Sequence, residues 1–76
     1  MNNKRRESIN KLISQIDDLK CQIETLRDEE QECYDNLPES LQGSERGEAA
    51  QSAIDALESA VSDIENAVSN LEEATA

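Results

Sequence analysis

The most regular part of the chain is residues 53–74, AIDALESAVSDIENAVSNLEEA, in which a seven-residue unit occurs three times and its first alanine then recurs. Each unit carries apolar residues at its second and fifth positions, as Val61 and Ile64 do in the middle unit. A seven-residue apolar repeat is typical of a long α-helix with one apolar seam. We therefore expect a helix over about residues 45–74 that packs against a second helix.

A matching seam runs through the first half of the chain. Its residues follow alternating steps of three and four, and they are Ile9, Leu12, Ile16, Leu19, Ile23, Leu26, Glu30, Cys33 and Leu37. In heptad notation the isoleucines, Glu30 and Leu37 occupy position a, and the other leucines and Cys33 occupy position d. Because Pro38 disfavours helical geometry in the residue before it, this helix is expected over about residues 4–36. Glu30 either is buried and fixes the register or reaches water near the turn, and we favour the second alternative.

The segment 37–44 has the residues of a turn. Pro38 can begin a short helical turn and Gly43 can close it. Ser44 is a good N-cap for the helix that follows, because its side-chain oxygen can accept a hydrogen bond from a free backbone N–H. The chain is therefore expected to reverse direction here.

Charged residues beside the two seams indicate the same reversal. In an antiparallel pair, the e positions of the two helices face each other. Pairing Arg27 with Glu58 and Lys20 with Glu65 then implies one common fold-back point, next to Gly43. The sequence thus predicts an all-α fold, an antiparallel two-helix coiled-coil hairpin that forms a single domain over residues 1–76.

A second copy is expected to complete the core. The chain has 76 residues, one Tyr and no Phe or Trp, so a lone hairpin should be marginally stable. The g positions of the second helix form an alanine column that lets another helix approach closely, and it consists of Ala53, Ala60, Ala67 and Ala74. We expect two hairpins to pack through it into a four-helix bundle. Ile at a with Leu at d leaves pairing through the first helix as an alternative, and either route gives a homodimer.

The charge of the chain is strongly acidic and uneven. The net charge is −11, with six basic and four acidic side chains in residues 1–27 but one basic and fourteen acidic in residues 28–76. Nucleic acid and anionic membranes would repel such a chain, so the expected partner is the basic surface of a protein.

Cysteine usage and hydropathy indicate a cytoplasmic protein. Cys21 and Cys33 are expected about 18 Å apart on one helix, which is beyond disulfide reach and fits a reducing compartment. No apolar stretch is long enough to span a bilayer, and the basic start is not followed by an apolar signal core.

Candidate partner-binding residues gather at the turn end of the expected hairpin. They combine carboxylates with large side chains, and they are Asp28, Glu32, Tyr34, Asp35, Leu37, Glu39 and Leu41. Tyr within a polar rim is a frequent interface anchor. The alternatives are that the carboxylates only keep the protein soluble and that the large side chains close the end of the core.

Catalysis is not supported by any group of residues. There is no His, no Gly-rich phosphate loop, and no Ser or Cys beside a plausible base. Two distant cysteines make no zinc site, and the carboxylates lack the spacing of a calcium loop. We expect a non-enzymatic protein without a metal or cofactor.

The turn segment YDNLPESLQ (residues 34–42), followed by Ser44, by Arg46-Gly47 and by the Ala-Ile-Asp-Ala-Leu-Glu run, resembles short acidic coiled-coil proteins of phages and prophages of Gram-positive bacteria. The resemblance implies a mobile-element setting. Small acidic proteins in that setting often resemble inhibitors that bind a host defence enzyme or a nucleic-acid enzyme. The resemblance does not assign a functional role to any particular residue of this chain.

These observations lead to three hypotheses of function. The first is a binding module that inhibits or modulates a host protein through the acidic turn end. The second is a structural or assembly accessory whose homo-oligomer is the function. The third is a sponge for a signalling nucleotide, for which only the basic end at Lys4, Arg5 and Arg6 offers suitable charges.

Overall fold

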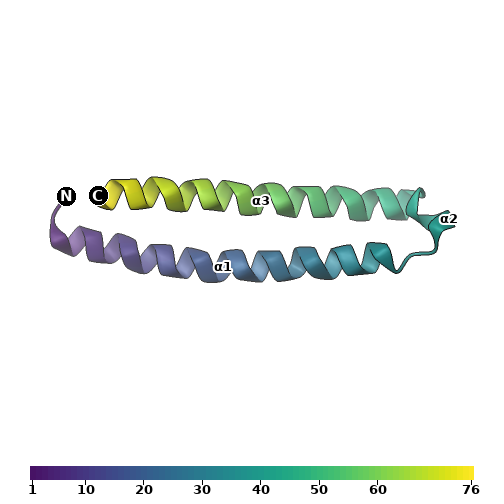
Figure 1. Ribbon diagram of the computed structural model, residues 1–76, viewed down its shortest axis with the longest axis horizontal. Coiled ribbons are helices and arrows are strands. Elements are labelled where there is room, and N and C mark those ends of the chain that lie inside the picture. The colour runs from purple at the N-terminus through teal and green to yellow at the C-terminus, as the bar shows by residue number, and fades with distance from the viewer.

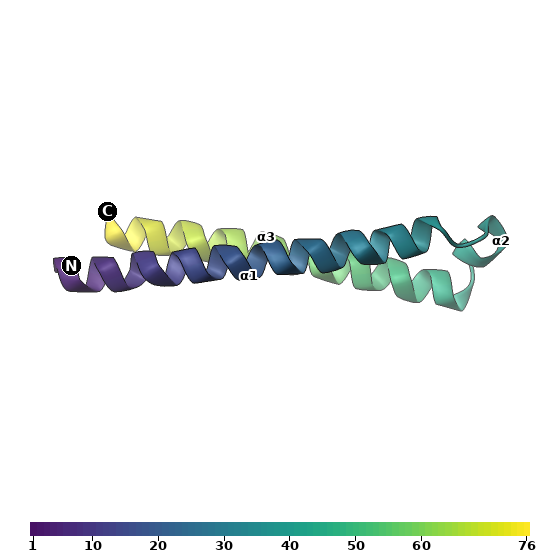
Figure 2. The same ribbon diagram turned by 90° about the horizontal axis from the view of Figure 1, so that it is seen from below.

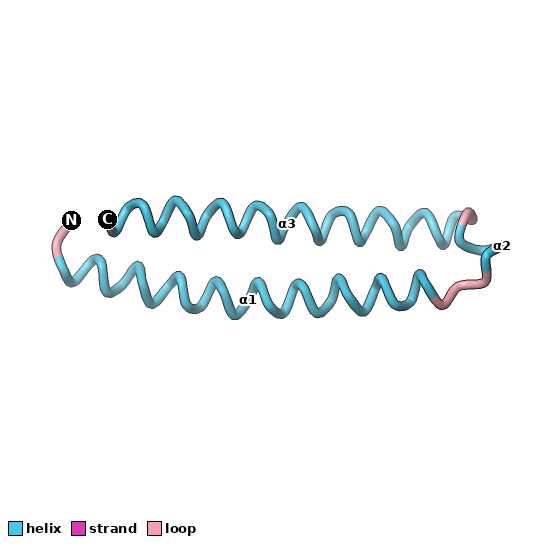
Figure 3. Tube along the Cα trace, in the orientation of Figure 1, coloured by secondary structure: helices cyan, strands magenta, loops and turns pink.

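The computed structural model describes residues 1–76 and consists of three α-helices without a strand (Figure 1). Helix α1 covers Asn3–Asp35, α2 covers Glu39–Gln42, and α3 covers Glu45–Thr75. The predicted all-α class is confirmed. The loops drawn in Figure 3 lie at the N-terminus and on either side of α2, and Ala76 follows the last residue of α3.

The two long helices lie side by side along their length, with α2 at one end of the pair and both chain termini at the other (Figures 1 and 2). The molecule is a rod that measures 58 × 15 × 12 Å. Residues near the start of the chain therefore lie beside residues near its end, and the acidic segment around α2 lies at the far end of the rod.

Each long helix begins at a side-chain cap. The Asn2 side-chain oxygen accepts a hydrogen bond from the Arg5 backbone N–H at 2.8 Å. The Ser44 hydroxyl oxygen accepts one from the Gly47 backbone N–H at 3.5 Å, so the predicted N-cap of the second helix is confirmed. Both caps satisfy backbone donors that have no partner within the first turn of a helix.

The connection between the long helices is held by Gln42, the last residue of α2. Its side-chain amide donates hydrogen bonds to the carbonyl oxygens of Tyr34, at 3.4 Å, and Leu37, at 3.2 Å. These carbonyls lie where α1 ends. The Tyr34 carbonyl also accepts from the Leu37 backbone N–H at 3.1 Å, but Pro38 has no N–H to continue the helical pattern. Gln42 thus ties the end of α1 to α2.

Helix α3 turns its a and d columns toward α1, as its repeat predicts. Ile54 is 1 % exposed, Val61 6 % and Ala50 9 %, and these three side chains are the buried hydrophobic core. The remaining large apolar residues of the two columns are partly buried, and they are Leu57, Ile64, Val68 and Leu71. The core is thin, since the chain buries only four residues in all.

The seam predicted for the first helix is wrong in one column. Leu12, Leu19 and Leu26, here called the leucine column, are 50 %, 55 % and 54 % exposed. Cys33, which continues this d column, is also exposed rather than part of the apolar seam. Most of the partly buried residues of α1 occupy positions a and e instead, with Glu24 and Gln31 at position b as the exceptions. Those at a and e are Arg6, Ile9, Ile13, Ile16, Lys20, Ile23, Arg27, Glu30 and Tyr34.

The width of the apolar face explains this rotation of α1. Ile13 at position e widens the face beyond the a and d columns, so that it spans three columns. A single neighbouring helix covers about two of them. Helix α3 covers a and e, where the aliphatic stems of Lys20 and Arg27 add apolar surface. The leucine column is left without a neighbour.

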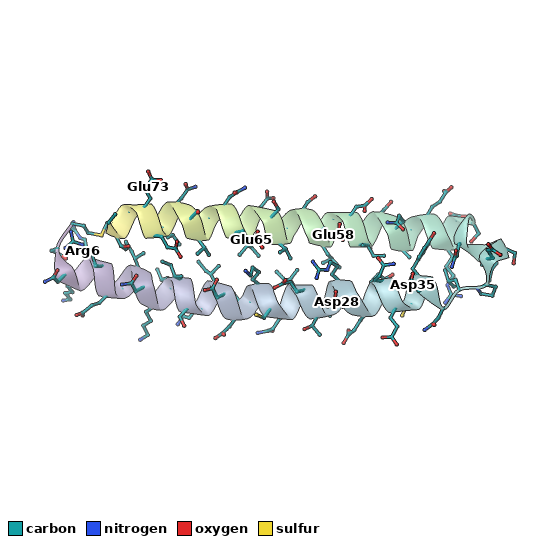
Figure 4. All side chains as sticks on the ribbon, viewed as in Figure 1. Arg6, Asp28, Asp35, Glu58, Glu65 and Glu73 are labelled. Carbon is teal, nitrogen blue, oxygen red and sulfur yellow. The ribbon has the colours of Figure 1, made fainter.

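Of the two predicted interhelical ion pairs, one is confirmed and one is wrong. Lys20 Nζ lies 3.8 Å from Glu65 Oε1. Arg27 does not reach Glu58; its guanidinium binds Asp28, the next residue, at 3.1 Å. Figure 4 shows Glu58 and Glu65 on the side of α3 that faces α1, whereas Glu73 points away. The adjacent carboxylate needs less side-chain ordering than one on the other helix, which explains why Arg27 pairs locally.

Candidate interaction surfaces

A pocket of about 370 Å³ lies at the turn end of the rod, between the end of α1 and the start of α3. Five of its seven lining residues are hydrophobic. The lining consists of Glu30, Cys33, Tyr34, Leu37, Arg46, Ala49 and Ala50.

The hydrogen bonds of Gln42 hold two of these lining residues in place. Tyr34 and Leu37 are the residues whose carbonyl oxygens accept from the Gln42 amide. Both side chains are partly buried, and they form the large apolar part of the pocket wall. The small side chains of Ala49 and Ala50 on α3 leave the space open opposite them. The pocket therefore forms only where the turn brings the end of α1 next to the start of α3, and neither helix forms it alone.

Two charged residues of opposite sign border the pocket. Glu30 on α1 is partly buried, and Arg46 on α3 is exposed. Neither takes part in an ion pair, so both charges are available to a bound group. An apolar floor with charged groups at its rim suits a side chain that has an apolar body and a polar or charged tip.

Only two of the seven predicted partner-binding residues line the pocket. Tyr34 and Leu37 meet in the pocket, whereas Leu41 lies in α2, is 41 % exposed and is not part of the lining. The four predicted carboxylates are all exposed, and they are Asp28, Glu32, Asp35 and Glu39.

Local contacts engage only half of these carboxylates. Asp28 binds Arg27, and Asp35 accepts a hydrogen bond from the Gln31 side chain at 3.0 Å. Glu32 and Glu39 accept no side-chain hydrogen bond and form no ion pair. Carboxylates that face water without an internal partner can be neutralised by a basic group from outside at little cost.

Several pocket residues were missed by the sequence analysis. Arg46 is the single basic residue after residue 27, a signal that could have pointed to it. Ala49 carried no signal, because alanine is common in helices. Ala50 continues the d column of the second helix, which predicts its burial but not its place beside a pocket. The place of both alanines in the pocket depends on how α3 starts relative to α2.

A second surface runs along one flank of the rod. The leucine column of α1 and the alanine column of α3 lie on the flank opposite to the Lys20–Glu65 pair, because d and g point away from e on each helix. In the alanine column Ala60 is partly buried, and Ala53, Ala67 and Ala74 are exposed. We call the leucine and alanine columns together the apolar flank.

The described side chains form no group of three His, Cys, Asp or Glu residues that could hold a metal ion. None of the helices has an apolar stretch of the length needed to cross a membrane. Comparison of the chain with family models, with characterised proteins and with solved structures gave no match.

Proposed function

We propose that the protein is a non-enzymatic binding module of phage or mobile-element type that inhibits or modulates a host protein, either a defence enzyme or a nucleic-acid enzyme. Its docking surface is the turn end of the rod. The observation that carries the proposal is the pocket lined by Tyr34 and Leu37, which opens next to exposed carboxylates.

The charge of the turn end defines the chemistry of the partner. Residues 28–48 contain eight acidic side chains and one basic side chain. A basic protein surface complements them, and an aromatic or aliphatic side chain of that surface fits the pocket as an anchor. Long-range attraction between the two surfaces raises the association rate, and salt screens it.

The proposal also covers the type of helix pair and the oligomeric state. The side-by-side helices are an antiparallel coiled-coil hairpin, and two copies form a homodimeric four-helix bundle. The support for this is the thin core of one copy together with the half-exposed leucine column. A protein whose chain buries only four residues gains stability from association.

A triple charge reversal tests the docking surface. A tagged protein is used to capture its partner from a bacterial lysate, and the dissociation constant is then measured with the purified partner. We expect Glu32→Lys, Asp35→Lys and Glu39→Lys together to weaken binding by about tenfold or more, with the loss greatest at low salt. Unchanged affinity in this variant would remove the turn end as the docking surface.

The matched control places the same charge change elsewhere on the protein. Asp55, Asp63 and Glu73 are exposed residues of α3, and changing all three to Lys alters the net charge by the same amount. This control should weaken binding much less. Equal losses in both variants would show that only the net charge matters.

A second candidate function is that of a structural or assembly accessory, and the half-exposed leucine column favours it. In that case Ala60→Leu with Ala67→Leu should abolish activity and the oligomer together, whereas a docking module retains binding as a monomer. The third hypothesis, a nucleotide sponge, would require cyclic nucleotides to raise the melting temperature in a thermal-shift assay. Loss of that effect on replacing Arg5 and Arg6 would locate the site.

A further inference from the structure

The apolar flank has the composition of a buried surface but is open to solvent. Its three leucines are each at least half exposed, and alanines repeat beside them on α3 at the same seven-residue interval. The g positions of α1 that border the leucine column are uncharged along most of the rod, and they are Ser8, Gln15 and Gln22.

This absence of charge is unusual in this chain, in which 33 % of the residues are charged. The opposite flank carries Lys20 and Glu65, and the turn end is acidic. A basic partner would find no complementary charge along the middle of the apolar flank. An uncharged, apolar surface matches the apolar flank better than a basic surface does. The same flank of a second copy of the chain is such a surface.

We infer that a second copy of the chain covers the apolar flank, and that the two rods run in opposite directions about a two-fold axis near Leu19 and Ala67. This inference rests on the homodimer proposed above and specifies the face, the symmetry and the neighbours. A two-fold axis makes an interface self-complementary, because each residue meets its partner's equivalent surface.

The position of the axis follows from the length of α1. Leu19 lies midway between the first and last residues of α1, Asn3 and Asp35. An axis at Leu19 therefore overlaps the two α1 helices along their full length. It places Leu12 of one copy against Leu26 of the second copy and vice versa. On α3, Ala67 meets Ala67 of the second copy, where small side chains let the helices approach closely.

The distribution of charge selects the opposite directions. If both turn ends lay at the same end of the dimer, two sets of eight carboxylates, each with one arginine, would lie together. With the rods reversed, each acidic end lies beside the basic residues Lys4, Arg5 and Arg6 of the second copy. Like charges repel at the first arrangement and opposite charges attract at the second.

One pair of charges is specific to the reversed arrangement. Arg5 is the only charged residue at position d of α1, and Glu29 is the only charged residue at position g. An axis at Leu19 places Arg5 opposite Cys33 of the second copy, which is one helical turn from Glu29. At each end of the apolar flank, Arg5 of one copy thus lies near Glu29 of the second copy.

Disulfide cross-linking tests the arrangement. Cys21 and Cys33 are first replaced by Ser, and Leu19→Cys is introduced so that the only thiols lie at the proposed axis. Under mild oxidation the dimer should link about tenfold or more faster than a control carrying Ser14→Cys, which lies on the outer face of α1. Ala67→Cys should link to itself in the same way.

The same variants report the opposite result. If the turn ends lay together, Leu19 of one copy would face Ala67 of the other. A mixture of Leu19→Cys and Ala67→Cys chains would then form mainly the mixed dimer, and each variant alone would link no faster than Ser14→Cys. That outcome would overturn the inferred arrangement.

Light scattering after size exclusion separates this inference from the homodimer itself. The Cys-free protein should have the mass of a dimer, and Leu19→Glu should reduce it to a monomer. A dimeric mass without accelerated Leu19→Cys linking would leave the homodimer standing and reject the axis. A monomeric mass of the unmodified protein at the highest concentration measured would reject both.

Discussion

Gly47 in the first turn of α3 packs directly against the backbone carbonyl group of Gln42 at the end of α2. A Cβ atom at Gly47 would lie 2.0 Å from the Gln42 oxygen, whereas a Cβ at Gly43 would meet nothing within 4 Å. Gly43 also has an ordinary φ of −87°, which any residue can adopt. The close approach of α2 to α3 therefore depends on Gly47, and the residue at the expected fold-back point needs no glycine.

These contacts predict opposite effects for two glycine substitutions. Gly47→Ala should destabilise the protein by roughly 1–3 kcal/mol, because the clash with backbone outweighs the better helix propensity of alanine. Gly43→Ala should be neutral or stabilising by up to about 1 kcal/mol, since it lowers the entropy of the unfolded chain. Urea unfolding followed by circular dichroism measures both. A Gly47→Ala protein as stable as the original would disprove the tight contact.

Ile54 and Leu19 should differ in how concentration affects the cost of truncation. Ile54 is 1 % exposed, so Ile54→Ala should cost about 2–5 kcal/mol at every protein concentration. Leu19 is 55 % exposed in one copy, so Leu19→Ala should cost little in the monomer and more as the dimer forms. Melting temperatures over a hundredfold concentration series would show the difference. A concentration-independent effect of Leu19→Ala would argue against its burial by a second copy.

The ion pairs predict coupling at one position and none at the other. A double-mutant cycle on Lys20 and Glu65 should give a coupling energy of about 0–1 kcal/mol that falls in high salt, because Glu65 is 58 % exposed. The same cycle on Arg27 and Glu58 should give none, since Arg27 binds Asp28. Coupling at Arg27 and Glu58 equal to that of the first pair would show that the local contact does not persist in solution.

A charge swap tests the ends of the inferred dimer. Arg5→Glu and Glu29→Arg should each weaken dimerisation at low salt, because each brings like charges together across the interface. The double variant should recover most of the loss, and sedimentation equilibrium measures all four proteins. Additive losses in the double variant would mean that the two residues do not meet.

The helices themselves follow from local features of the sequence. The seven-residue repeat predicts α3, the alternating steps of three and four predict α1, and Pro38 and Ser44 mark the connection. These features act within a few residues along the chain, so they can be recognised without knowledge of the partner helix. The a and d columns of α3 are predicted correctly as well, because its large apolar side chains are confined to these two columns and only alanines stand beside them at g.

The candidate sites are predictable only in part. Tyr34 and Leu37 were expected at the turn end and line the pocket there, whereas the place of Ala49, Ala50 and Arg46 opposite them depends on the approach of α2 to α3. Leu41 belongs to the same segment, but its side chain is exposed and does not line the pocket. Spacing in sequence brings residues to one end of a rod but does not say which of them share a cavity.

Sequence alone thus determines that two long helices exist, where they begin and end, and which side of each is apolar. Only the tertiary structure decides that α1 turns its a and e columns toward α3, that Arg27 binds Asp28, and that Gly47 rather than Gly43 is the glycine required. The physical reason is that α1 has an apolar face three columns wide, and one neighbour can cover it in two ways. Contacts between helices select one of them, and the leucine column is the part of the face that remains uncovered.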